Sequence, residues 1–316
     1  MASLVMEAIR RARPPRLYVA ADGPRELSGE KERCDQARRI ANAVDWPCEV
    51  QTLFRVRNLG CRIAVSSALD WFFEQEEEGI ILEDDCVPSR SFFPYCDRLL
   101  ERFRYDERVM CISGNNFQQG RSVTRYSYYF SRYPHCWGWA SWRRAWRLYD
   151  SSMNLWVHYR QSRALDLLSD GDPTFAGYWT EIFDRVERGE IDTWDYQWMF
   201  SCWAQDGLTC LPVRNLVTNV GLGHPDATHT KNANGSGSNP PQEELEFPLL
   251  HPPLITRDVE ADRFTHVHHF GVQPNLGPGK NSVIAAARKF VKRLPFAAIL
   301  LAQSRQWRRT KATNAH

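Results

Sequence analysis

The sequence lacks any long hydrophobic run. The longest, residues 296–302, has only seven residues, which is too short for a helix that spans a bilayer. At the N-terminus the apolar residues precede the first arginines, the reverse of their order in a secretory signal. Hydrophobic residues make up 43% of the 316 and charged residues 25%, so a mostly disordered or fibrous chain is also excluded. We therefore expect a globular, cytoplasmic protein.

The sequence also lacks a Cys-X-X-Cys pair. Its nine cysteines are scattered and odd in number, which argues against a disulfide framework and against a zinc knuckle. Reduced thiols packed in a core are the simpler interpretation.

No acidic residue follows Asp262. The residues up to that point hold 30 Lys and Arg against 38 Asp and Glu, a net charge of −8, and the residues after it hold 10 Lys and Arg. An acidic body argues against nucleic acid as a partner.

The basic tail carries an amphipathic pattern. In residues 283–294 the apolar side chains fall on one helical face beside four Lys and Arg residues, which predicts a basic amphipathic helix. Such a helix, together with the apolar run 296–302 that follows it, would bind peripherally to the inner face of the cell membrane. Docking of the same helix on the acidic body is the alternative.

Strand and helix patterns alternate along the first part of the chain. The predicted strands are 17–21, 49–54, 79–82 and 109–113, and the predicted helices are 28–43, one that opens at Asn58, and 92–103. This alternation is typical of an α/β fold with a Rossmann-type, mostly parallel sheet flanked by helices. Ligands of such sheets bind at the carboxyl ends of the strands. We expect an N-terminal segment over 1–15, a catalytic domain over 16–255 and a C-terminal extension over 256–316.

Glu83, Asp84 and Asp85 directly follow the third predicted strand. Three adjacent carboxylates repel one another, and a hard divalent cation with oxygen ligands would compensate their charge. Strand alternation places Glu83 and Asp85 on one side and Asp84 on the other. One carboxylate could then bind metal while another holds a ribose hydroxyl. An exposed acidic turn is the alternative.

The helix predicted to open at Asn58 offers an anion site. Free N–H groups and partial positive charge at a helix N-terminus suit a diphosphate. Arg57 or Arg62 would add a charged donor. A plain capped helix with surface arginines is the alternative.

Asp195 lies between Trp194 and Trp198. Partial desolvation by these rings would make its carboxylate a better proton acceptor. Asp192 and Glu181 compete for the same role, and a helix N-cap is the alternative role for Asp195.

Five motifs and the acidic run together resemble a known family. The motifs are Asp22-Gly23-Pro24, Arg57-Asn58-Leu59-Gly60-Cys61, Trp137-Gly138-Trp139-Ala140-Ser141-Trp142, Trp194-Asp195-Tyr196-Gln197-Trp198, and Gly221-Leu222-Gly223 with Ala227-Thr228-His229-Thr230. Over 16–253 the chain resembles bacterial GT-A nucleotide-diphospho-sugar transferases, the haemolysin-like group, in which these motifs occur in the same order. The acidic run resembles the Asp-X-Asp metal motif of GT-A enzymes, and the residues after it are similar to the N-acetylglucosaminyltransferase I group.

The resemblance implies a glycosyltransferase. The expected reaction moves a sugar from a nucleotide-diphospho-sugar, with UDP as the expected nucleotide, to a hydroxyl of a glycan or lipid-linked glycan in polysaccharide biosynthesis. The resemblance implies Mn²⁺ or Mg²⁺ held by Asp85 and His229, with His224 as the alternative ligand. It also implies that Asp195 is the base of an inverting reaction.

The resemblance also implies contacts to the two substrates. The expected nucleotide-sugar residues are Asp22, Gly23, Arg57, Asn58, Arg62, Glu83 and Asp84. Gly23 would allow close approach of the nucleotide, although an ordinary strand-ending turn is the alternative. Trp137 and Trp139 would stack on sugar rings, but both could equally belong to the core. A histidine cluster within 266–269, spaced partly as on a strand face, stays unassigned.

Two rival functions remain from the sequence. A sugar nucleotidyltransferase shares the sheet and the metal, but it usually carries a Gly-rich basic loop after the first strand, and Asp22-Gly23-Pro24-Arg25 is short for that. A non-catalytic glycan-binding module would use the Trp-rich segment, but it has no need for an acidic run on a buried strand.

Overall fold

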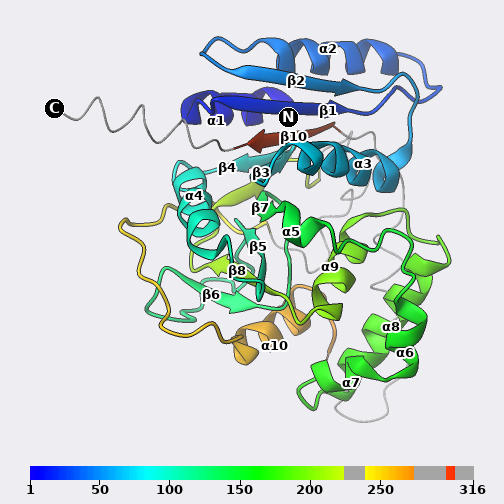
Figure 1. Ribbon diagram of the computed structural model, residues 1–316, viewed down its shortest axis with the longest axis vertical. Helices are drawn as coiled ribbons and strands as arrows, with labels where there is room; N and C mark the ends of the chain where they lie inside the picture. The colour runs from blue at the N-terminus through cyan, green and yellow to red at the C-terminus, as the bar shows by residue number, and fades with distance from the viewer. Residues whose placement is uncertain (224–238, 274–296, 303–316) are drawn as a thin grey trace.

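A mixed β-sheet runs through the centre of the protein (Figure 1). The computed structural model describes residues 1–223 and 239–273 in full, and the backbone of 297–302. The strands are β1 (Arg16–Ala21), β2 (Glu49–Phe54), β3 (Glu78–Glu83), β4 (Cys86–Pro88), β5 (Val109–Ser113), β6 (Tyr128–Ser131), β7 (Trp139–Trp142), β8 (Leu208–Pro212), β9 (Val217–Asn219) and β10 (Ala297–Ala302). The helices are α1 (Ala2–Ala12), α2 (Glu30–Asn42), α3 (Gly60–Gln75), α4 (Phe92–Phe103), α5 (Arg143–Trp146), α6 (Trp156–Gln161), α7 (Ala164–Leu168), α8 (Pro173–Glu187), α9 (Asp195–Ala204) and α10 (Val259–His268).

The sheet is mixed, so the mostly parallel sheet that we expected is wrong. Its strand order is β2-β1-β10-β3-β7-β5-β8-β6. Of these neighbours only β1–β2 and β5–β8 are parallel, and the other pairs are antiparallel. The four strands predicted from the sequence are β1, β2, β3 and β5. The pairings show that all four run in the same direction. The reversed strands β6, β7 and β10 come from regions where the alternating pattern stops. The carboxyl ends of β1, β3 and β5 therefore still share one edge.

Two apolar cores cover the two faces of the sheet. Alternate residues of each strand enter different cores: Ile81 of β3 and Trp139 of β7 enter one, whereas Leu82 and Trp142 enter the other. Helices α3, α8 and α9 pack on the first face, and α1 and α4 pack on the second. Burial on both faces explains why the strands read as continuous apolar runs. Figure 1 shows α6, α7 and α8 grouped to one side of the sheet.

Both ends of the chain contribute to this body. In α1, Val5 and Ile9 are fully buried, so the expected N-terminal segment packs on the second core. The backbone of β10 pairs with β1 and β3. We expected this run to add apolar surface for a membrane, and that expectation is wrong because the strand lies inside the sheet. The amphipathic helix predicted over 283–294 lies outside the described residues. Within the described part of the chain, no helix has the length and apolar character needed to cross a membrane.

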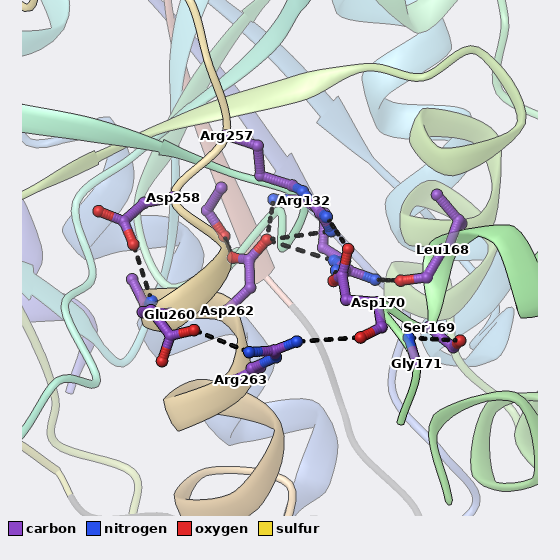
Figure 2. Close-up of polar contacts among 12 residues, drawn as sticks. Arg132, Leu168, Ser169, Asp170, Gly171, Arg257, Asp258, Glu260, Asp262 and Arg263 are labelled. Atoms are coloured by element: carbon purple, nitrogen blue, oxygen red, sulfur yellow. Dashed lines mark hydrogen bonds and ion pairs between the residues drawn. The ribbon is translucent and has the colours of Figure 1, made fainter. Parts of the chain in front are cut away.

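A buried ionic network joins β6, the α7–α8 connection and α10 (Figure 2). Arg132 donates to Asp262 at 3.2 Å and also pairs with Asp170. Arg257 pairs with the same two carboxylates and lies 3.7 Å from Asp262. Burial raises the pKa of Asp262 to about 6, although Arg132 opposes the shift. The Arg132 guanidinium also lies 4.7 Å over the ring of Phe175.

Removing Asp262 should destabilise the fold strongly. Asp262→Ala leaves two arginines sharing one carboxylate in a buried place, so we expect a loss of about 3–5 kcal/mol in the free energy of unfolding by urea titration. Glu260→Ala is the control, because the Glu260–Arg263 pair is exposed and such pairs contribute about 1 kcal/mol or less. Equal losses in the two variants would contradict this account of the network.

Candidate functional site

The acidic run lies at the carboxyl end of β3. Glu83 ends the strand, and Asp84 and Asp85 form the turn into β4. Ligand atoms of Glu83, Asp85 and Cys86 all lie within 4.8 Å of one another, so Glu83 and Asp85 share a side as strand alternation predicted. All three carboxylates are partly buried.

The acidic run is electrostatically unfavourable on its own. Burial, and next the charge of Asp85, raise the pKa of Glu83 well above its usual range and that of Asp84 to about 7. Burial also raises the pKa of Asp85. Among the described residues no Lys or Arg side chain bonds to this run, and the positive charge that reaches Asp84 and Asp85 is the α-amino group of Met1.

The donor set fits a hard divalent cation. Glu83 and Asp85 offer carboxylate oxygens, which Mg²⁺ and Mn²⁺ prefer. Cys86 is fully buried, and its thiol donates to Oδ1 of Asp85 at 3.2 Å. The geometry is compatible with a ligand role for the two carboxylates and a supporting role for the thiol. The sequence predicts Asp85 as a metal ligand and Glu83 as a nucleotide contact, and both roles stay predictions; Cys86 is not among the predicted site residues.

Asp195, the first residue of α9, lies near enough to the acidic run for its charge to reach Glu83. This charge adds to the rise in the pKa of the Glu83 carboxyl. Thr193 donates from its hydroxyl to Oδ1 of Asp195, and the Tyr196 amide donates to the same oxygen at 2.9 Å. The other oxygen, Oδ2, accepts no hydrogen bond from the described residues. The N-cap position falls on Trp194, without a side-chain capping bond, so the capping role kept as the alternative for Asp195 is not formed.

Asp22 bonds to the N-terminus of α3. Its carboxylate accepts from the Gly23 amide at 2.9 Å, from Leu59 at 3.0 Å and from Gly60 at 3.2 Å. A Cβ at Gly23 would lie 2.3 Å from the carbonyl carbon of Arg57. Glycine is therefore required here by the packing of two backbone segments, whether or not a nucleotide also approaches.

The same helix end also contacts a second carboxylate. Asp192 accepts from the Arg62 amide at 3.4 Å, so two of the chain's own acids bond to the amides where we expected a diphosphate. The guanidinium groups of Arg57 and Arg62 form no hydrogen bond or ion pair with described residues, and their role in binding diphosphate stays a prediction. Asn58 donates its side-chain amide to the Gly23 carbonyl at 2.9 Å.

A narrow pocket opens beside Asp22. Its lining residues are Ala20, Ala21, Asp22, Leu53, Arg55, Ala64 and Val65. Its volume of about 10 Å³ holds roughly one water molecule, so a heterocycle would have to lie over its mouth rather than inside it. The pocket lies at the carboxyl ends of β1 and β2, the edge where ligands of such sheets bind.

The two tryptophans of the Trp-Gly-Trp motif have different environments. Trp139 is fully buried and stacks on Trp194 with ring centroids 5.6 Å apart. Its predicted stacking on a sugar is wrong, because the core covers both faces of the ring. Trp137 is partly exposed and touches Phe117 edge-on, so its sugar contact stays a prediction.

The structure does not identify a histidine ligand for the metal among the described residues. His229 and His224 lie outside the described residues, so the second metal ligand stays a prediction. His266 and His268 belong to α10 rather than to a strand. His269, just past the end of that helix, stacks on Phe117 with centroids 3.9 Å apart.

A short two-stranded ribbon, β4 with β9, fixes the place of Asp85. Val217 of β9 is fully buried, and a Cβ at Gly114 or Gly138 would come within 2.5 or 2.7 Å of its side chain. Gly138 also has a positive φ of 76°, which favours glycine. The glycine of the Trp-Gly-Trp motif therefore admits the ribbon that carries the site, a role that the sequence did not indicate.

Sequence comparisons assign no family to the chain. Neither a scan of protein-family models nor a search of curated proteins finds a match. The resemblance to glycosyltransferases rests on the motifs alone, and the function has to be argued from the geometry above.

Neutralising one acid of the run should stabilise the metal-free protein. Asp85→Asn removes one of three repelling charges and keeps an oxygen for the Cys86 thiol. We expect its melting temperature in EDTA to rise by about 2 °C or more, while the rise that Mn²⁺ produces in the parent protein by binding the folded state is lost. Glu107→Gln, at an exposed position, should change neither value. A lower melting temperature for Asp85→Asn in EDTA would contradict the repulsion.

Proposed function

We propose that this protein is a metal-dependent glycosyltransferase of GT-A-like architecture. It moves a sugar from a nucleotide-diphospho-sugar, with UDP the expected nucleotide, to a hydroxyl of a glycan or lipid-linked glycan. The observation that carries the proposal is the pairing of Glu83 and Asp85, whose ligand atoms lie within 4.8 Å of one another where β3 ends, with Asp195 near enough for its charge to act on Glu83. A cation site and a free carboxylate oxygen at one place are what such a transfer requires.

Glu83 and Asp85 hold the cation in this mechanism. A bound Mn²⁺ or Mg²⁺ supplies positive charge against the leaving diphosphate. Asp84, which does not belong to the cluster of Glu83, Asp85 and Cys86, is left for a donor hydroxyl. Arg57 and Arg62 bring further positive charge to the diphosphate.

Asp195 takes the proton of the acceptor. Its Oδ1 is held by the Thr193 hydroxyl and the Tyr196 amide, which leaves Oδ2 to receive the proton. The acceptor oxygen forms a bond to the anomeric carbon as the bond from that carbon to the diphosphate oxygen breaks. Attack from the face opposite the leaving group inverts the configuration.

The donor binds along the neighbouring strand ends. The nucleotide lies over the carboxyl ends of β1 and β2 beside Asp22, and Asn58 and Arg62 lie at the adjacent start of α3. Trp137, partly exposed, offers a ring face to a sugar. A lipid-linked acceptor in bacterial polysaccharide biosynthesis would bring the enzyme to the inner face of the cell membrane.

The products test the proposal against its rivals. The protein is incubated with UDP-, GDP- and dTDP-sugars, with and without Mn²⁺, and the nucleotide products are separated by chromatography. Free nucleoside diphosphate that forms only with Mn²⁺ supports a transferase. Pyrophosphate would support a nucleotidyltransferase, and metal-independent glycan binding without donor turnover would support a binding module.

Asp195→Asn should retain donor binding and lose transfer. We expect transfer to fall about 100-fold or more, the scale of a general base, with an unchanged Kd for nucleoside diphosphate and Mn²⁺ by calorimetry. Glu181→Gln removes the competing acid on α8 and should leave the rate near that of the parent. If Glu181→Gln loses transfer and Asp195→Asn does not, the base is misassigned.

A further inference from the structure

Gly221 lies directly against the carboxylate of Asp85. A Cβ at position 221 would lie 2.4 Å from Oδ2 of Asp85 and 3.1 Å from Oδ1 of Asn219. Contacts this short do not occur for real Cβ atoms, so either the carboxylate or the backbone would have to move. Gly221 does not have a left-handed φ, and its backbone conformation therefore does not call for glycine.

Hydrogen bonds hold Gly221 in this place. The Val220 amide donates to the carbonyl of Asp85 at 2.8 Å. The Gly221 amide donates to the side-chain oxygen of Asn219 at 2.8 Å, and Asn219 pairs with Cys86 across the β4–β9 ribbon. Asp85 itself and the next residue, Cys86, are therefore tied to the segment that carries Gly221.

The two oxygens of Asp85 have different neighbours. Oδ1 accepts from the Cys86 thiol at 3.2 Å, while Oδ2 is the oxygen that a Cβ at Gly221 would meet. Glycine at 221 thus leaves room for the second oxygen while the thiol orients the first. A side chain at 221 would turn the carboxylate away from its present place beside Glu83.

This glycine differs from the others near the site. Added Cβ atoms at Gly114 and Gly138 would meet apolar atoms of Val217, Phe92 and Leu82. The lack of a Cβ at these two glycines therefore makes room for apolar side chains. At Gly221 the closest atom is instead a candidate ligand oxygen.

We propose that Gly221 is a positioning residue for the cation site, whose missing side chain sets the orientation of the Asp85 carboxylate. The inference rests on the proposed function, because it assumes that Glu83 and Asp85 bind the cation. Gly221 has no side chain to offer as a ligand, so it acts through Asp85. Residues that orient metal ligands typically change metal affinity by about 10- to 100-fold when mutated.

The test compares Gly221→Ala with Gly177→Ala on the full chain. A Cβ at Gly177, on α8, would meet nothing within 4 Å, so the control makes the same chemical change in open space. Mn²⁺ binding is measured from the electron paramagnetic resonance signal of free Mn²⁺, and melting temperature is measured in EDTA. We expect Gly221→Ala to bind Mn²⁺ at least about tenfold more weakly, with Gly177→Ala equal to the parent.

The outcomes separate this inference from the proposed function. A parent protein that binds no Mn²⁺ overturns both. A parent that binds Mn²⁺, with Gly221→Ala binding it equally well, overturns the role of Gly221 and leaves the proposed function standing. Should Gly221→Ala fail to fold, the double variant Asp85→Ala/Gly221→Ala removes the carboxylate that the new Cβ would meet. Recovery of the folded state in the double variant supports the inference, and continued failure to fold overturns it.

Discussion

Repulsion among three adjacent carboxylates at the end of a buried strand is the constraint on which the rest of the site depends. β3 is paired on both edges and covered on both faces, so Glu83 at its end and Asp84 and Asp85 in the turn after it are only partly exposed to water. Their negative charge has to be compensated where it lies, or the groups have to take up protons. A site of this kind lowers the stability of the empty protein and increases its affinity for a cation.

The surrounding structure keeps these acids in place rather than relieving them. Val217 packs against two glycines and locks the β4–β9 ribbon onto the sheet, and the ribbon in turn holds Asp85 through Cys86. Thr193, just before α9, orients Asp195 in the same manner. Asp85 and Asp195 thus each have Oδ1 engaged by a neighbouring donor. Such preorganisation is typical of sites that stabilise charge developing in a reaction.

The sequence predicted the elements with simple periodicity and missed those built by distant pairing. Helix α4 matches the predicted 92–103 because its apolar spacing is regular, and β1, β3 and β5 were found because they are buried on both faces, whereas β2 is a partly exposed edge strand. β7 was not predicted, because its aromatic residues are as typical of a core strand as of a sugar-binding site. In the structure Trp139 belongs to the core. The bond from Asp22 to the α3 amides joins residues more than thirty positions apart, which no local pattern encodes. Asp195 was found through its flanking rings, but Thr193, which orients it, gave no signal.

The central claim is that Glu83 and Asp85 hold a divalent cation against a nucleoside diphosphate. Crystals grown with Mn²⁺ and UDP, measured at the manganese absorption edge, test it most directly. The account predicts an anomalous peak bonded to oxygens of both carboxylates and of the diphosphate, with Cys86 outside the coordination sphere. An anomalous peak at another acidic cluster, or UDP bound without metal at this edge, would contradict it.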